Sequence, residues 1–238
     1  MKIRNLGAII NDSLRKQFIL ASFERYGHKN ELLDLGCGIK PFRHVYFKYT
    51  ASSIGIDVAT SPHTQTQVDV IYDGINIPFE SSRFDYVLCT EVMEHVAEPT
   101  AFLKEINRVM RPGGILIMTT PFLVPLHEEP YDFYRYTKHG ISHLISNAGF
   151  KLEHIESFSG YWGVLIAFLV QPQLKIWNKL SKLLRFKLLY SAFNPFIFLG
   201  VVAPQFLYLF LITLSGKTKS GPLTNYTPRG YGYTARKM

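Results

Sequence analysis

Short apolar segments, each bounded by turn-forming residues, recur through the first 120 residues and constrain the fold more than any other feature. Their lengths suit strands, and amphipathic stretches separate several of them. Because parallel strands need long and usually helical crossover connections, this alternation predicts an α/β fold with a mostly parallel sheet. The predicted strands are Glu31–Leu35, Ser53–Asp57, Thr66–Ile71, Phe84–Cys89 and Ile115–Thr119.

Three stretches of the chain are predicted to be helical. The clearest is Glu98–Met110, whose apolar residues recur three or four positions apart on one face. Pro99 suits the first turn of this helix, and the Pro112-Gly113 pair ends it. The same signals predict helices at Asp12–Arg25 and Thr137–Asn147 and a further strand at Lys151–Ser157.

The composition suits one folded domain with a single hydrophobic core. Of the 238 residues, 47% are hydrophobic and 18% are charged, which excludes a disordered or collagen-like chain. Two cysteines are too few for a disulfide framework or a structural zinc site, so we expect a reduced, cytosolic setting. The apolar run Leu6–Ile10 is shorter than a signal peptide requires, and we therefore expect no export.

A glycine turn directly follows the first predicted strand. In Gly36-Cys37-Gly38, the missing side chains let backbone N–H groups approach a ligand closely. The turn lacks the third glycine of the dinucleotide fingerprint, so a packing turn explains it equally well. Asp57 ends the second predicted strand about twenty residues later, where a carboxylate accepts both hydroxyls of a ribose. Together the two features favour a nucleotide-like cofactor.

Further motifs follow these two in order and spacing: Asp73–Phe79, Phe84–Leu88, Glu94–Val96 and Arg108–Gly114. With them, residues 30–157 resemble the class I S-adenosylmethionine-dependent methyltransferases. The resemblance implies a Rossmann-like, seven-stranded, mostly parallel sheet with flanking helices. It also implies S-adenosyl-L-methionine as cofactor, bound across the carboxyl ends of the first strands.

The resemblance assigns seven residues to the cofactor. The methionine part would be held at the end of the first strand by Asp34, Gly36 and Gly38. The ribose hydroxyls would be held by Asp57 after the second strand, and the adenine amino group by Asp73 after the third. The site would be closed by Thr90 and Glu91 after the fourth strand. Lys40 replaces a glycine of many relatives and precedes Pro41, so we expect an altered start of the next helix.

The segment Pro121–Thr137 is rich in aromatic, acidic and basic residues and follows the fifth strand. It resembles a segment of bacterial methyltransferases associated with cell-surface glycan or lipid-linked pathways. Methyl transfer to a hydroxyl needs a base, for which His127 is the candidate, with Asp132 to orient it. Tyr134 and Arg135 are candidates for holding a polar or anionic acceptor. Alternatively, Asp132 and Arg135 form an i, i+3 pair that only fixes the loop.

His95 follows the fourth strand and is the second candidate near the transferred methyl group. It ranks below His127 because, in this fold, it often starts or supports a helix. A sulfonium is already activated for methyl transfer, and no ligand cluster with metal-binding spacing stands out in the sequence. We therefore expect no metal site.

Charge is distributed unevenly along the chain. All eighteen acidic residues lie within residues 1–156, whereas ten of the 26 basic residues lie beyond them. Lys175–Lys187 is a basic amphipathic stretch that contains Trp177 at its apolar edge. Basic residues mixed with aromatic and aliphatic ones favour anionic lipid over nucleic acid, so we expect a membrane-surface partner and no nucleic acid.

The uncharged run Leu188–Ser215 follows this basic stretch. Its central nineteen residues, Phe196–Leu214, would span about 28 Å as a helix at about 1.5 Å per residue. Pro195 and Pro204 interrupt the run, and basic residues flank both ends, which favours a shallow re-entrant hairpin at least as much as a single span. We expect attachment to the cytoplasmic face of the cell membrane. The alternatives are a homodimer interface and a buried helical cap.

These features predict a methyltransferase domain at residues 1–160 and a hydrophobic, basic, membrane-associating helical insertion at residues 161–220. Residues 221–238, with a strand at Tyr226–Lys237, would complete the sheet, so the insertion would separate its last two strands. The leading hypothesis is a membrane-associated methyltransferase that acts on a lipid-linked glycan or another cell-envelope precursor. The alternatives are methylation of an isoprenoid quinone or another lipophilic small molecule, and a non-catalytic, cofactor-binding membrane scaffold.

Overall fold

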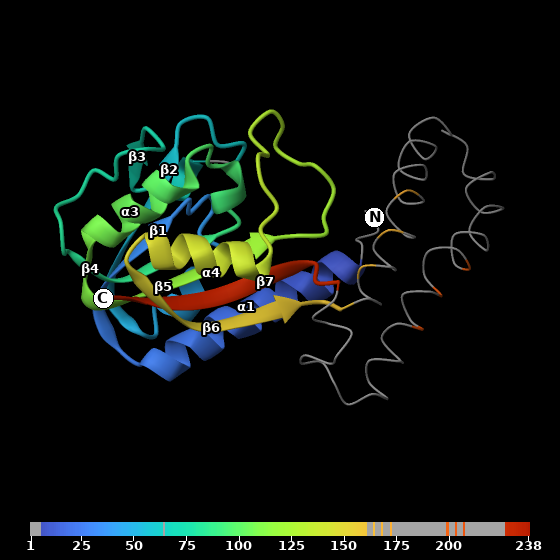
Figure 1. The fold of residues 1–238 in the computed structure, drawn as a ribbon, viewed down its shortest axis with the longest axis horizontal. Coiled ribbons are helices and arrows are strands. Elements are labelled where there is room, and N and C mark those ends of the chain that lie inside the picture. The colour runs from blue at the N-terminus through green and yellow to red at the C-terminus, as the bar shows by residue number, and fades with distance from the viewer. Residues whose placement is uncertain are drawn as a thin grey trace. The chain divides into compact units, whose positions relative to one another are not determined.

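The computed structural model describes residues 6–63, 65–160 and 227–238, with isolated positions at 164, 168, 172, 199, 203 and 207. Figure 1 shows helices packed around a central sheet. In chain order the elements are α1 (Leu6–Tyr26), β1 (Lys29–Leu35), α2 (Arg43–Tyr46), β2 (Thr50–Val58), the 3-10 turn η1 (Gln65–Gln67), β3 (Val70–Tyr72), β4 (Phe84–Thr90), the 3-10 turn η2 (Met93–His95), α3 (Pro99–Val109), β5 (Met110–Pro121), α4 (Lys138–Asn147), β6 (Phe150–Phe158) and β7 (Gly230–Lys237).

The seven strands form one sheet in the order β3-β2-β1-β4-β5-β7-β6. The pairs from β3 through β5 are parallel, and β7 runs antiparallel to β5. The chain order reverses at β1, which has β2 on one side and β4 on the other. Open parallel sheets bind ligands outside the carboxyl ends of the strands at such a reversal, so the topology already indicates where a site lies. The predicted seven-stranded, mostly parallel sheet is confirmed.

Alternate side chains of β4 face opposite helical layers. Val87 and Cys89 belong to the main core, which also contains the buried faces of α3 and α4. Tyr86 points to the other layer, where its ring meets Phe23 of α1 edge to face, with ring centroids 5.1 Å apart. Figure 1 shows the same division, with α3 and α4 on one face of the sheet and α1 on the other.

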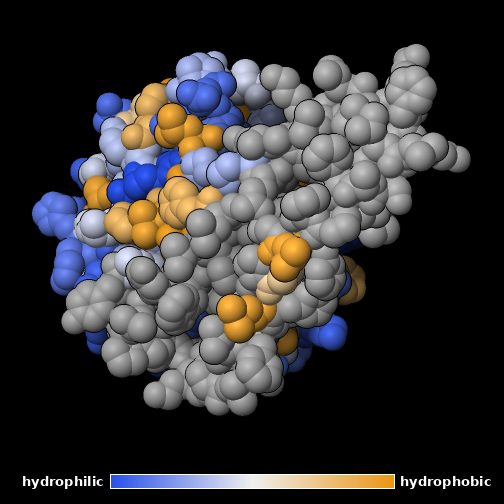
Figure 2. Space-filling model, turned by 90° about the vertical axis from the view of Figure 1, so that its right-hand side faces the viewer, coloured by the Kyte–Doolittle hydropathy of each residue, from blue (hydrophilic) through white to orange (hydrophobic). Residues whose placement is uncertain are grey.

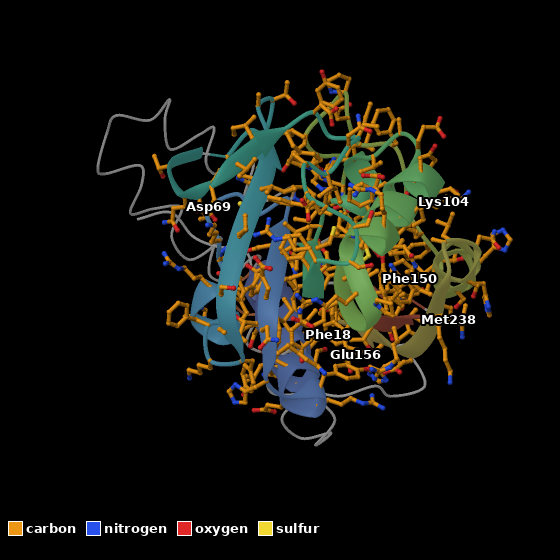
Figure 3. The ribbon with its side chains drawn as sticks, turned by 90° about the vertical axis from the view of Figure 1, so that its left-hand side faces the viewer. Phe18, Asp69, Lys104, Phe150, Glu156 and Met238 are labelled. Carbon is orange, nitrogen blue, oxygen red and sulfur yellow. The ribbon has the colours of Figure 1, made fainter. Side chains whose placement is uncertain are left out.

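The C-terminal strand is part of the sheet rather than a trailing end. Tyr233 is fully buried against the core, and the backbone N–H of Met238 donates to the carbonyl of Gly149. Figure 3 shows Met238 and Phe150, the first residue of β6, on the same side of the molecule. The prediction that the last residues complete the sheet is therefore correct, with the strand beginning at Gly230 rather than Tyr226.

Two predicted strands differ most from the structure in their bounds. Thr66–Ile71 was expected as a strand, but its first residues form η1, and β3 is only Val70–Tyr72. The Asp69 carboxylate accepts from the backbone N–H of Gly55 at 2.7 Å and fixes the chain just before β3. In contrast, β5 is longer than Ile115–Thr119 because Met110 already pairs with Phe84, across a register shift in β4.

The predicted insertion 161–220, including Lys175–Lys187 and Leu188–Ser215, lies outside the described residues apart from the isolated positions. Within the described part of the chain, no helix is both long enough and apolar enough to cross a membrane. The chain divides into two units, and one of them comprises residues 15–156 and 230–238. All residues of the candidate site lie in this unit.

Candidate functional site

The glycine turn after β1 is fixed by sterics at Gly36. Its φ of 68° lies in the left-handed region, and a Cβ placed there would come within 2.3 Å of the Val92 side chain. The backbone N–H groups of Gly36 and Cys37 both donate to the carbonyl of Ile56 in β2. A side chain at Gly36 is therefore excluded, and the turn is held against the end of the neighbouring strand.

Asp57 connects the end of β2 to this turn. Its buried carboxylate accepts from the backbone N–H of Gly38 through Oδ2 at 2.9 Å and from the backbone N–H of Val58 through Oδ1 at 2.8 Å. The predicted contact with ribose hydroxyls is untested, but Asp57 stands at the carboxyl edge where that role requires it. Each carboxylate oxygen retains capacity to accept one more hydrogen bond.

Asp34 is the buried acid of the site. Only 4% of the residue is exposed, and its Oδ2 atom has no hydrogen-bond partner among the described residues. Burial raises the pKa of Asp34 to about 7. A buried carboxylate with a free acceptor atom is suited to a cationic ligand group, so this residue fits the ammonium of a bound amino-acid moiety.

Lys40 has a left-handed backbone conformation, which glycine adopts more readily than other residues. Its φ is 51°, and its ammonium binds the carboxylate of Asp69, which is labelled in Figure 3. The Lys40 side chain lies against β2 at Gly55, since a Cβ on this glycine would meet it. The following helix, α2, has only four residues and begins at Arg43. Lys40 and Pro41 thus precede a short helix, and an altered start of this helix relative to other family members stays a prediction.

Asp73 organises its own turn after β3. Oδ1 accepts from the backbone N–H groups of Ile75 and Asn76, and Oδ2 accepts from the Asn76 side-chain amide. These hydrogen bonds, above all that from the Asn76 side chain, lower the pKa of Asp73. The carboxylate is exposed and stays ionised, and the predicted contact with an adenine amino group is untested.

Thr90 and Glu91 lie at the carboxyl end of β4. Glu91 has a φ of 54°, and its carboxylate accepts from the Thr119 hydroxyl of β5 at 2.9 Å. Its other oxygen lies 3.6 Å from the guanidinium of Arg15 in α1. Glu91 is therefore held by neighbouring elements on both sides, and Thr90 pairs with Thr119 in the sheet.

In the loop after β5, Asp132 serves both roles that the sequence left open. Its side chain is 1% exposed, and Oδ2 accepts from the backbone N–H of His127 at 3.0 Å and lies 3.3 Å from His127 Nδ1. Both oxygens also accept from the Arg135 guanidinium, which is the main reason that the pKa of Asp132 falls to about 2. Asp132 thus orients His127 and fixes the loop through Arg135.

Tyr134 and Arg135 are largely engaged within the protein. The Tyr134 hydroxyl donates to the carbonyl of Ala97 at 3.0 Å. Arg135 donates to Asp132 and to the carbonyls of Tyr134 and Pro125. These contacts favour a structural role for both residues over the predicted hold on an acceptor, because the Tyr134 hydroxyl and both terminal nitrogens of Arg135 already have partners.

The sequence analysis named Glu94 only as part of a motif and gave it no role in the site, and the structure buries it completely in η2. Neither carboxylate oxygen has a hydrogen-bond partner among the described residues, and burial raises the pKa of Glu94 well above its ordinary value. The rings of His95 and His127 meet edge to face beside it, with centroids 5.0 Å apart. The sequence predicted no metal-ligating cluster, whereas the structure brings together three potential ligands, Glu94, His95 and His127.

Comparisons with known proteins agree with this geometry. A family model described as a methyltransferase domain matches residues 33–118. A ubiquinone biosynthesis O-methyltransferase of Cereibacter sphaeroides (strain ATCC 17029) is 32% identical over 99 residues, which cover 37% of this chain and 40% of that protein. The chain therefore spans well under two thirds of that relative's length.

Solved structures of low identity share the fold. A SAM dependent methyltransferase from Archaeoglobus fulgidus superimposes with a TM-score of 0.54 at 16% identity, over 93% of this chain and 94% of that one. The [4+2]-cyclase SpnF gives a TM-score of 0.55 at 18% identity, over 95% and 80% of the two chains. The fold and the family match agree: residues 33–118 belong to a class I S-adenosylmethionine-dependent methyltransferase domain.

Proposed function

We propose that the protein transfers a methyl group from S-adenosyl-L-methionine to a hydroxyl oxygen of a lipophilic small molecule, an aromatic precursor of an isoprenoid quinone. The matched relative, an O-methyltransferase of ubiquinone biosynthesis, supports this acceptor over the lipid-linked glycan that the sequence favoured. The observation that carries the proposal is the arrangement of Asp34, the glycine turn and Asp57 at the carboxyl edge of the sheet.

The residues fit the cofactor at two places. The free acceptor atom of Asp34 suits the ammonium of the methionine part, and Asp57 suits the ribose hydroxyls. When bound, the cofactor supplies an electrophilic methyl group, whose bond to sulfur breaks as the acceptor oxygen forms its bond to carbon. The electron pair remains on sulfur, which gives S-adenosylhomocysteine. The chain must orient the acceptor in line with the methyl group and remove the hydroxyl proton.

The loop after β5 supports a lipophilic acceptor. Large apolar side chains are exposed along it, with Leu126 at 68% and Tyr131 at 53%. Figure 2 shows apolar and hydrophilic side chains side by side on the coloured part of one face of the molecule. His127 lies within this loop and is the candidate proton acceptor, oriented by Asp132. Exposed apolar side chains in the same loop as an imidazole suit a hydroxylated aromatic ring with a hydrophobic tail.

Incubation of the full-length protein with methyl-labelled S-adenosyl-L-methionine and a short-chain polyprenyl catechol tests this function. We expect label in the organic-extractable aromatic product and none with Asp57→Asn. Label that enters a lipid-linked glycan from added native membranes instead would support the cell-envelope hypothesis. If no fraction is labelled while S-adenosylhomocysteine still binds, the scaffold hypothesis stands.

We also propose that the domain works at the cytoplasmic face of the membrane. The support is the charge distribution of the sequence: a basic amphipathic stretch, Lys175–Lys187, precedes the uncharged run Leu188–Ser215. A lipophilic acceptor dissolved in the bilayer would then reach the site by lateral diffusion rather than through water. Anionic lipid is the expected partner of the basic stretch.

A further inference from the structure

We propose that Glu94, His95 and His127 bind one first-row transition-metal dication beside the cofactor site. One potential ligand atom from each residue lies within 4.8 Å of the other two. The nearer pairs are Glu94 Oε1 with His95 Nε2 at 3.7 Å and Glu94 Oε1 with His127 Nε2 at 3.9 Å. A tetrahedral ion with bonds of about 2.1 Å holds its ligand atoms about 3.4 Å apart. The two Glu94 pairs therefore need to close by a few tenths of an ångström, and the two histidine nitrogens, which lie within 4.8 Å of each other, by at most about 1.4 Å.

Glu94 is the observation that points to a ligand. The residue is 0% exposed, and neither carboxylate oxygen has a hydrogen-bond partner in the described part of the chain. A buried carboxylate without partners is costly unless a proton or a cation compensates it. The two imidazole nitrogens that face it are metal ligands in their neutral form, so a cation would satisfy all three groups together.

The other nitrogen of each ring has an acceptor beside it. His95 Nδ1 lies 3.0 Å from the carbonyl oxygen of Tyr131. His127 Nδ1 lies 3.3 Å from the carbonyl oxygen of Pro125 and 3.3 Å from Asp132 Oδ2, with the Arg135 guanidinium at 3.4 Å. An Nδ1–H that donates to a carbonyl or a carboxylate leaves the lone pair on Nε2, and this is how proteins orient histidine ligands.

Two connections hold the ligands in place. The backbone carbonyl of Glu94 accepts from the N–H groups of Phe133 and Tyr134, and the Tyr136 hydroxyl donates to the carbonyl of Met93. These contacts tie η2, which carries Glu94 and His95, to the loop that carries His127. The ligands therefore come from adjoining segments that are fixed to each other, as a preorganised metal site requires.

A second acidic group lies beside the cluster. Glu128 Oε2 lies 3.8 Å from His95 Nε2, and the Glu128 side chain is one-third exposed. Because its side chain is partly exposed, Glu128 lies where solvent or the acceptor molecule would reach the ion. Two imidazoles with one buried carboxylate suit Mn²⁺, Fe²⁺, Co²⁺ or Zn²⁺ better than Ca²⁺ or Mg²⁺, which prefer oxygen ligands throughout.

The catalytic consequence rests on the proposed function. A hydroxyl oxygen bound to a dication would release its proton to solvent more readily, and this oxygen would form its bond to the methyl carbon as the bond from that carbon to sulfur breaks. His127 Nε2 would then be a ligand and would not take the proton. The metal dependence of methyl transfer distinguishes these two roles of His127.

Titration of the metal-stripped full-length protein with Co²⁺ tests the binding site without any acceptor. We expect one bound ion per chain with visible absorption bands of low coordination number, and at least tenfold weaker binding in Glu94→Gln and His127→Ala. The matched control is His139→Ala, an exposed histidine of α4 outside the cluster, which should bind Co²⁺ as the parent protein does. Should Glu94→Gln not fold, His127→Ala carries the test, because that side chain is partly exposed.

Binding of S-adenosylhomocysteine, measured on the same samples, reports whether each variant is folded. The proposal is overturned if the folded parent protein binds no Co²⁺, Mn²⁺ or Zn²⁺ at millimolar concentration, or if both variants bind as tightly as the parent. Metal binding without methyl transfer to any acceptor would overturn the proposed function and leave the metal site standing. Methyl transfer that persists in the presence of a chelator, with no metal bound, would overturn the catalytic role of the metal and leave the proposed function standing.

Discussion

Asp34 makes the protein sensitive to pH through a single residue. Its pKa is raised from an ordinary value of 3.8 to about 7 because burial disfavours the charged form. The folded protein therefore holds a proton on Asp34 that the unfolded chain releases between these two values. The contribution of Asp34 to the free energy of unfolding is full below pH 4, falls as the pH rises towards 7, and stays low above it.

We expect Asp34→Asn to remove this dependence. In thermal unfolding between pH 5 and pH 8, the melting temperature of the variant should fall less with rising pH than that of the parent protein. S-adenosylhomocysteine should bind the parent about tenfold more weakly for each pH unit below 7, because its ammonium needs the ionised carboxylate. Calorimetric titrations that give the same pH profile for both proteins would show that Asp34 does not face the cofactor.

Gly36 is a second position where one added carbon atom should change the stability of the protein. Gly36→Ala adds a Cβ that comes within 2.3 Å of Val92, in a backbone with a φ of 68°. Gly113 is the matched control, since its φ is 76° but a Cβ there meets nothing within 4 Å. Both variants carry backbone strain of about 1 kcal/mol, and only Gly36→Ala adds the clash.

Chemical denaturation should therefore show a larger loss of unfolding free energy in Gly36→Ala than in Gly113→Ala, by more than about 1 kcal/mol. The double variant Gly36→Ala/Val92→Ala should recover part of that difference, because it removes the side chain that the new Cβ meets. Equal losses in the two single variants would mean that Val92 moves aside freely.

Among the elements, the loop after β5 depends on a small number of polar contacts. Asp132 joins His127 to Arg135, and the carbonyl of Glu94 accepts from Phe133 and Tyr134. Asp132→Asn removes the charge that pairs with Arg135 and weakens the contact with His127, at a cost of about 2 kcal/mol to the loop.

We expect faster amide hydrogen exchange in this loop for Asp132→Asn, with little change in exchange of the β4 and β5 core. The control is Glu153→Gln, which breaks a comparable pair with Arg236 elsewhere on the sheet. If both variants leave exchange in the loop unchanged, the backbone contacts to Glu94 suffice to hold it.

The elements differ in how far the sequence predicts them. β1 and β4 are continuous apolar runs with turn signals at their ends, and both lie where they were expected. β3 was misplaced because its register depends on Asp69, whose partners Lys40 and Gly55 are distant in sequence. The four-residue helix α2 is too short for helical periodicity to reveal it.

The sequence likewise predicts only part of the candidate site. Its glycine turn and acids follow strands in order, so local motifs identify them. The cluster of Glu94, His95 and His127 was missed because the loops that follow two neighbouring strands bring the residues together across more than thirty positions. The adjacent glutamate and histidine after β4 were visible in the sequence, but only the pairing of β4 with β5 shows which histidine faces them.

At the scale of the whole molecule, the separation of charge predicts how the protein meets a membrane. All acidic residues precede position 157, so the basic stretch Lys175–Lys187 has no acidic neighbours in sequence. A basic residue near an anionic surface contributes about 1 kcal/mol, and salt screens this attraction. Vesicle co-sedimentation should therefore show that the full-length protein prefers phosphatidylserine-containing vesicles to neutral ones, and more strongly at low salt.

The variant Lys175→Gln/Lys179→Gln/Lys182→Gln should lose most of the preference for anionic vesicles, because three of the five basic residues in the stretch become neutral. It should still bind S-adenosylhomocysteine, since the cofactor residues lie in a different part of the chain. If the uncharged run Leu188–Ser215 enters the bilayer, alkaline carbonate will leave the parent and the variant in the membrane pellet alike. Complete release of both by carbonate, with equal binding to neutral and anionic vesicles, would contradict lipid attachment and favour the homodimer or helical-cap alternatives.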